Sequence, residues 1–201
     1  MLGKTHMMVG IATSLAITRP QKISHMVMAV GAGAIGGLIC DIDVETSKSH
    51  KEADRLVALS CIFIMAIMVS DLFFNTKIFS GIMSNGGIIR ILIGMAIFIG
   101  VCAYGKEQPH RTFMHSLLAL ILLDIGLLIA FRKIVVYFSI GFLSHIGIDI
   151  LNKRKVKVLY PFGDGIALSL CTAKGLVNDL LLMGASVIVV IESILFFMRV
   201  L

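Results

Sequence analysis

The sequence is poor in charged and aromatic residues. Of its 201 residues, 15% are charged; it contains no Trp and only 3 Tyr. Soluble domains carry about 25% charged residues. Because 58% of the chain is hydrophobic, a soluble core of this size could not bury so much apolar surface. The composition therefore excludes an ordinary soluble domain and predicts a protein that is embedded in lipid.

Cysteine is also scarce, and its spacing excludes two further classes. The four residues Cys40, Cys61, Cys102 and Cys171 lie far apart, and most lie within apolar runs. They form neither a zinc-binding pair nor the framework of a small disulfide-rich domain. We therefore expect buried free thiols.

The net charge of +6 does not indicate a nucleic-acid partner. The basic residues form short clusters between apolar runs, and Lys153, Arg154, Lys155 and Lys157 are one such cluster. Clusters of this kind are typical of loops that flank membrane spans. The expected partner is the lipid bilayer, and no nucleic acid is expected.

Apolar runs follow one another along the whole chain. A helix that crosses a membrane needs about 20 apolar residues. The pattern predicts an all-α, polytopic membrane helical bundle of roughly five to seven apolar helices, with residues 1–201 forming a single membrane-embedded domain. The runs cover residues 7–18, 26–40, 56–74, 88–104, 116–131, 134–151 and 180–198.

A glycine-rich segment at residues 31–36 matches the spacing of a dinucleotide-binding loop. No strand precedes it, and the whole segment has a helical pattern, so the context of such a loop is missing. Ala29, Gly33 and Gly37 instead lie four positions apart, which gives a helix face without large side chains. We interpret this face as a close helix–helix contact.

The histidines gather at one membrane face if each long run spans the bilayer once. Lys and Arg are more numerous on the same face, which the positive-inside rule assigns to the cytoplasm. The aspartates of this face are Asp41, Asp43 and Asp149. Its histidines are five of the six in the chain: His6, His50, His110, His115 and His145.

Two short patterns at helix ends have metal-binding character. His145 and Asp149 are four residues apart and share a helix face, which fits either a metal clamp or a histidine bonded across a helix interface. Asp41-Ile-Asp43 ends the glycine-rich helix, where the dipole disfavours carboxylates. A cation or the start of the next helix would compensate them.

The most specific pattern is His110-Arg111-x-x-x-His115, which opens an apolar helix. A helix N-terminus attracts anions, and a guanidinium pairs with phosphate or carboxylate in two-pronged geometry. Two histidines beside such a site favour metal-assisted phosphoester chemistry. The alternative is a polar interfacial segment in which Arg111 extends toward the headgroups.

Taken in chain order, these motifs resemble the YdjM-like family of bacterial and archaeal inner-membrane proteins, often labelled metal-dependent hydrolases. The resemblance implies a multi-pass protein of the inner (plasma) membrane. The chain departs from the family pattern at Val44, where a histidine is common, and at Met114, where threonine is common. The matching motifs are Thr5-His6-x-x-x-Gly10, Asp41-Ile-Asp43, His110-Arg111-x-x-x-His115-Ser116, Ser144-His145-x-x-x-Asp149 and Tyr160-Pro161-Phe162.

The family is distantly similar to zinc-dependent phospholipases C, which implies hydrolysis of phosphoesters such as phospholipids or lipid phosphates. We expect one to three divalent ions, with Zn²⁺ favoured and Mn²⁺ or Fe²⁺ as alternatives. Asp43, Arg111 and His115 are the expected catalytic residues, with Arg111 holding the anionic group of the substrate. The expected metal ligands are His6, Asp41, Asp43, His110, His115, His145 and Asp149.

Two other functions fit the sequence. Asp71, Asp124 and Glu192 lie within apolar runs, and acids inside a membrane are typical of ion or small-molecule transporters. A non-catalytic membrane scaffold with a structural metal site is the other alternative, and its metal would have no open coordination position.

Overall fold

The fold is helical, as predicted, in a computed structural model that describes residues 1–43, 62–63, 66–67, 69–77, 87–172 and 175–200. Three short 3-10 helices lie between the longer helices: η1 (Cys40–Asp43), η2 (Phe113–His115) and η3 (Arg132–Ile134). The α-helices of the described residues are α1 (Gly3–Thr18), α2 (Ile23–Ile39), α5 (Gly87–Lys106), α6 (Leu117–Phe131), α7 (Val135–Ile150) and α8 (Leu176–Val200).

Six of the seven predicted apolar runs coincide with these α-helices, and the run at residues 56–74 lies partly outside the described residues. Within the described part, three helices are long and apolar enough to cross a membrane: Ile23–Ile42, Ile89–Lys106 and Leu176–Val200. That number is smaller than the predicted five to seven. The reason is length, because a helix of 16 residues reaches about 24 Å and a bilayer core is about 30 Å thick.

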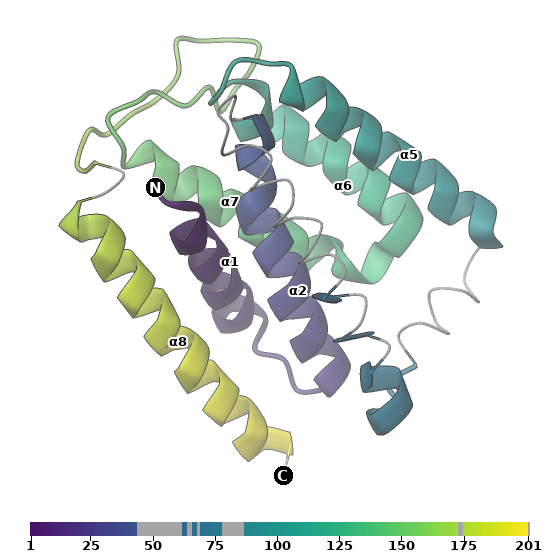
Figure 1. The fold of residues 1–201 in the computed structure, drawn as a ribbon. Helices are drawn as coiled ribbons and strands as arrows, with labels where there is room; N and C mark the ends of the chain where they lie inside the picture. Colours follow the sequence, from purple (N-terminus) through teal and green to yellow (C-terminus); the bar gives the residue numbers. More distant parts are fainter. Residues whose placement is uncertain (44–61, 64–65, 68, 78–86, 173–174, 201) are drawn as a thin grey trace.

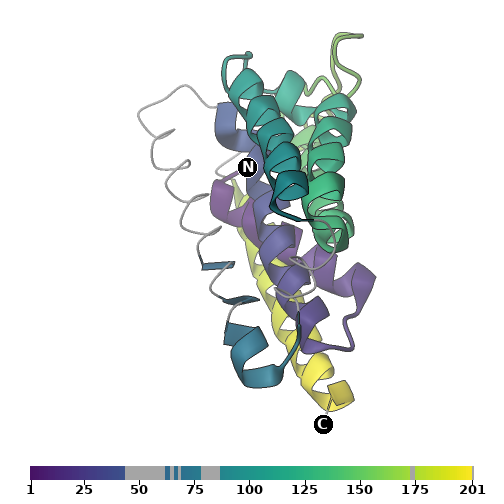
Figure 2. The ribbon, with the colours of Figure 1, turned by 90° about the vertical axis from the view of Figure 1, so that its right-hand side faces the viewer.

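The helices α1, α2 and α7 pack against one another in the centre of the bundle (Figure 1). The helix α8 covers the outer side of α1, while α5 and α6 form an antiparallel pair at the other side of the bundle (Figure 2). The inner helices therefore carry the core, and α5 and α8 are left with long apolar surfaces on the outside of the protein.

Glycines of α2 allow the three inner helices to approach closely. A Cβ atom added at Gly37 would lie 2.6 Å from the carbonyl oxygen of His6, and one added at Gly33 would lie 2.8 Å from the Cβ atom of Ser14. On the side of α2 that faces α7, Gly36 lies against the carbonyl of Phe138. The predicted close contact of this glycine face is confirmed.

The close packing brings four chain segments together at one end of the bundle. The first turn of α1, the helix η1 after α2, the helix η2 before α6 and the last turn of α7 all lie at the upper end in Figure 1. The bundle therefore collects helix ends from distant parts of the sequence at one site.

Candidate metal centre

His6 enters this end of the bundle from the first turn of α1, where it is fully buried. The side chain of Asn178 in α8 holds this turn, because its Oδ1 atom accepts hydrogen bonds from the Leu2 amide at 3.1 Å and the Thr5 hydroxyl at 2.8 Å. The Nε2 atom of His6 lies 3.4 Å from Oδ1 of Asp149. Its Nδ1 atom has no hydrogen-bond partner among the described residues.

His145 lies one turn before Asp149 on α7, outside the three candidate spans. Its Nδ1 atom lies 2.8 Å from the carbonyl oxygen of Gly37 and donates to it, because a carbonyl only accepts. Burial, followed by the neighbouring His6, lowers the pKa of His145 to about 3, so the ring is neutral near pH 7. The Nε2 atom therefore presents a lone pair, the form that binds a metal.

His115 is the last residue of η2 and is fully buried. Ser116 fixes its position by capping α6, because the Ser116 hydroxyl accepts a hydrogen bond from the Ala119 amide at 3.1 Å. The Nε2 atom of His115 lies 3.3 Å from Nε2 of His145. The ring of His145 also stacks on that of His6, with 3.7 Å between the ring centres. Three imidazoles from three helices thus meet in one buried cluster.

Asp149 lies in the middle of this cluster and is 1% exposed. Its Oδ1 atom lies 3.1 Å from the amine of Met1, and its Oδ2 atom lies 2.9 Å from the Arg111 guanidinium and 3.6 Å from Nε2 of His115. Burial alone would raise the pKa of Asp149, but the hydrogen bond with His6 and the nearby His145 lower it well below the ordinary range. Asp149 is therefore a carboxylate anion.

Arg111 supports Asp149 from a strained backbone position. Its φ angle of 69° lies in the left-handed region, which residues other than glycine seldom occupy. One guanidinium nitrogen contacts Asp149, and another donates to the carbonyl of Arg154 at 2.8 Å. The Arg111 carbonyl accepts from the Lys157 amide at 3.0 Å. Arg111, which we expected to hold an anionic substrate, thus pairs with a carboxylate of the cluster itself.

The remaining predicted residues lie toward the outer side of the cluster. Asp41 in η1 has a side chain that is 15% exposed, and its Oδ1 atom lies 3.6 Å from His145 and 3.8 Å from His115. His110 is half-buried and meets His115 edge-on, with 5.0 Å between the ring centres. Asp43 is the last residue of η1, and its side chain lies outside the described part of the structure.

The two histidines that remain are His50 and His25. His50 falls outside the described residues. The Nδ1 atom of His25 lies 2.7 Å from the Tyr137 hydroxyl, at the opposite end of α2 from η1, so His25 has a structural hydrogen bond elsewhere.

The geometry fits a divalent metal. Within each of three overlapping groups, one ligand atom per residue lies within 4.8 Å of the others. Neutral imidazoles and carboxylates suit Zn²⁺, and the Nε2 atoms of His115 and His145 lie 3.3 Å apart beside the carboxylates of Asp41 and Asp149. Asp41, His115 and His145 are each shared between two of the groups. The groups are His6, Asp41 and His145; Asp41, His110 and His115; and His115, His145 and Asp149.

Sequence reasoning missed the groups that support the ligands. Asn178 is fully buried and anchors α1, yet in the sequence it is an ordinary polar residue near the start of the last apolar run. Asn152 is also buried, and its side-chain oxygen accepts from the Met1 amine at 3.0 Å and from the Arg111 guanidinium at 3.1 Å. The carbonyl of Gly37 orients His145, and no side-chain pattern could have identified it.

The fold and the cluster together define a class: a helical membrane protein with a buried group of histidines and aspartates that can hold a metal ion. The sequence model of the YdjM inner membrane protein family matches residues 1–200, and the chain belongs to this family. The family and the apolar helices locate the protein in the inner membrane. No curated protein and no solved structure matches the chain.

Proposed function

We propose that the protein is a membrane-bound, metal-dependent hydrolase of phosphoesters, with membrane lipids that carry phosphate as the favoured substrates. The observation that carries the proposal is the convergence of His6, His115 and His145 around the anionic Asp149. Imidazoles and carboxylates brought together in this way form the ligand set that Zn²⁺ prefers. The preferred ion is Zn²⁺, with Mn²⁺ and Fe²⁺ as alternatives.

The exposure of the cluster favours an enzyme over a scaffold with a structural metal. His6, His115 and His145 are fully buried, whereas Asp41 is partly exposed and His110 is half-buried. A catalytic metal keeps a coordination position open to substrate, while a structural metal is closed on all sides. We assign the side of Asp41 and His110 as the side from which substrate enters.

The donor set also supports the choice of reaction. A bound divalent ion would polarise a phosphoryl oxygen and lower the pKa of water. In the proposed reaction water adds to phosphorus, the bond from phosphorus to the leaving oxygen breaks, and the departing alkoxide receives the proton. Of the two carboxylates described in the cluster, Asp41 is the more exposed and is assigned to accept the proton of the water, while Arg111 holds Asp149 in position. We assign this face of the membrane to the cytoplasm.

Turnover by the purified protein tests the proposal. The metal-loaded protein in detergent is incubated with a chromogenic phosphodiester, a chromogenic phosphomonoester and phospholipids. We expect turnover of at least one of them, reduced at least about 100-fold in His145→Ala because a metal ligand is lost. The matched control His25→Ala, which changes a histidine outside the cluster, should retain the wild-type rate. A metal-loaded wild type that hydrolyses none of them would contradict the proposal.

A further inference from the structure

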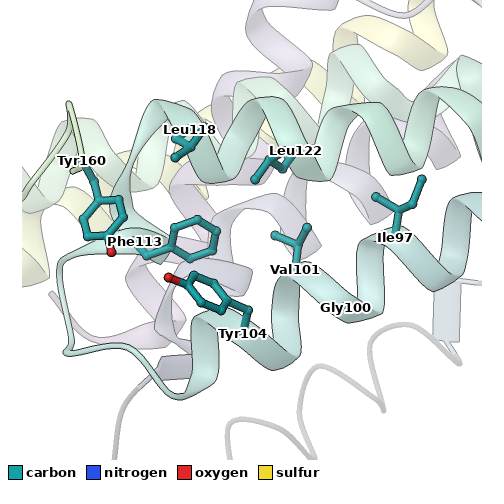
Figure 3. A pocket seen from close by; sticks show the side chains of 8 residues that line it. All are labelled: Ile97, Gly100, Val101, Tyr104, Phe113, Leu118, Leu122 and Tyr160. Atoms are coloured by element: carbon teal, nitrogen blue, oxygen red, sulfur yellow. The ribbon is translucent and has the colours of Figure 1, made fainter. Parts of the chain in front are cut away.

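An apolar groove of about 450 Å³ lies between α5 and α6 (Figure 3). This volume is within the range of about 300–1,000 Å³ that small-molecule pockets occupy. Ile97 and Val101 line it from α5, and Leu118 and Leu122 line it from α6. Its long walls are therefore hydrocarbon and suit a hydrocarbon ligand.

The groove ends at aromatic side chains, two of which carry hydroxyls. Phe113 lies between Tyr104 and Tyr160, with ring centres 4.8 Å and 5.8 Å apart, respectively (Figure 3). Tyrosine at the end of an apolar surface is typical of the boundary between hydrocarbon and headgroups. This end of the groove is therefore suited to the place where an acyl chain meets its polar head.

The aromatic end of the groove adjoins the metal centre along the chain. Phe113 begins η2 and His115 ends it. Two residues span at most about 7 Å. A lipid with a chain along α5 and α6 would thus have its head beside His115, on the side of the half-buried His110.

The residues around the groove indicate that it opens toward lipid and that its ligand is anionic. The helix α5 is a candidate membrane span with exposed apolar residues such as Leu92 and Ile99, so the groove opens toward lipid. Lys153, Arg154 and Lys155 are exposed in the segment after α7, whose Arg154 carbonyl binds Arg111. Cations at the headgroup level favour an anionic lipid.

From these observations we infer that the groove between α5 and α6 holds an acyl chain of a phosphate-bearing membrane lipid, whose headgroup reaches the His/Asp centre. The inference rests on the proposed function, because it names the substrate class and the part of the protein that selects it. A short soluble phosphoester would use the centre without the groove.

Gly100 offers a way to fill the groove without disturbing the protein. It lines the groove, and a Cβ atom added there would meet nothing within 4 Å among the described residues. Gly184 on α8 is the matched control, since it is also an exposed helical glycine with nothing within 4 Å of an added Cβ atom. Gly100→Phe should block the groove, and Gly184→Phe should leave it open.

The test is photo-crosslinking in nanodiscs with a phosphatidylglycerol that carries a diazirine near the middle of one acyl chain. In wild type the label should fall on residues 97–101 or 118–122. Gly100→Phe should reduce labelling at least about fivefold, and Gly184→Phe should leave it unchanged. A diacylglycerol probe with the same chains should label the groove several-fold more weakly.

Three results would overturn the inference. If labelling were unchanged in Gly100→Phe, the probe would be reacting from the surrounding bilayer and not from the groove. Equal labelling by the phospholipid and diacylglycerol probes would show that the groove does not select a phosphate-bearing lipid. A change in the oligomeric state of Gly100→Phe with unaltered labelling would make the groove a contact between two copies of the chain.

Turnover separates failure of this inference from failure of the proposed function. Suppose that wild type and Gly100→Phe hydrolyse a soluble phosphodiester at equal rates and are also labelled equally. In that case the groove assignment alone is wrong. If labelling follows the expected pattern but neither soluble nor lipid phosphoesters are hydrolysed, the hydrolase assignment is wrong and lipid binding in the groove stands.

Discussion

The Nε2 atoms of His115 and His145 face each other at 3.3 Å, although the two residues come from different helices. The Gly37 carbonyl holds the proton of His145 on Nδ1, so its Nε2 atom has a lone pair to share. We propose that a divalent cation binds between these rings and the neighbouring carboxylates.

Asn178→Ala should weaken metal binding although Asn178 is not a ligand. Its side chain accepts from Leu2 and Thr5 and so fixes the turn that carries His6. Removing groups that orient ligands costs about 10–100-fold in metal affinity. A zinc titration measures the effect, with Ser186→Ala on the same helix as control, because Ser186 bonds only within α8 among the described residues. Unchanged affinity in Asn178→Ala would show that α1 needs no anchor.

Arg111→Ala should destabilise the protein, because it leaves the buried Asp149 without its guanidinium partner. Breaking a buried pair from one side costs about 3–5 kcal/mol. Arg111→Lys should restore little of the lost stability, because two different guanidinium nitrogens contact Asp149 and the Arg154 carbonyl. Thermal unfolding in detergent measures the change. If stability were unchanged and only the KM for a phosphoester rose, Arg111 would bind substrate, as the sequence had suggested.

Gly37→Ala should separate α1 from α2 and disrupt the centre. The added Cβ atom would lie 2.6 Å from the His6 carbonyl oxygen, which is backbone and cannot turn away. Overpacking of this kind costs about 1–3 kcal/mol. Gly147→Ala on α7 is the control, because its Cβ atom would meet nothing within 4 Å among the described residues. Thermal unfolding and metal content should both fall only in Gly37→Ala, and equal values in the two variants would contradict the account.

Much of the fold was predictable because an apolar segment in lipid forms a helix, which satisfies its own backbone hydrogen bonds. Six runs matched α-helices. The helix predicted at the motif that begins at His110 is α6, which Ser116 caps. The number of candidate spans was overestimated because α1, α6 and α7 are apolar but short. An apolar pattern alone does not separate a short buried helix from a membrane span.

The site was predictable only in part, because side-chain patterns describe ligands better than their supports. His145 and Asp149 share a helix face, so their spacing was informative. The partner of Arg111 and the anchor at Asn178 depend on contacts between α-helices and loops that are far apart in sequence. No local pattern carries that information.

Metal content is the most direct test of the central claim. The protein is purified in mild detergent, supplied with Zn²⁺, dialysed and analysed by mass spectrometry for metal per chain. We predict at least about one tightly bound ion in wild type and in His25→Ala, and loss of bound metal in His115→Ala and His145→Ala. Wild-type protein without bound metal, or His115→Ala and His145→Ala variants that retain it in full, would contradict the account.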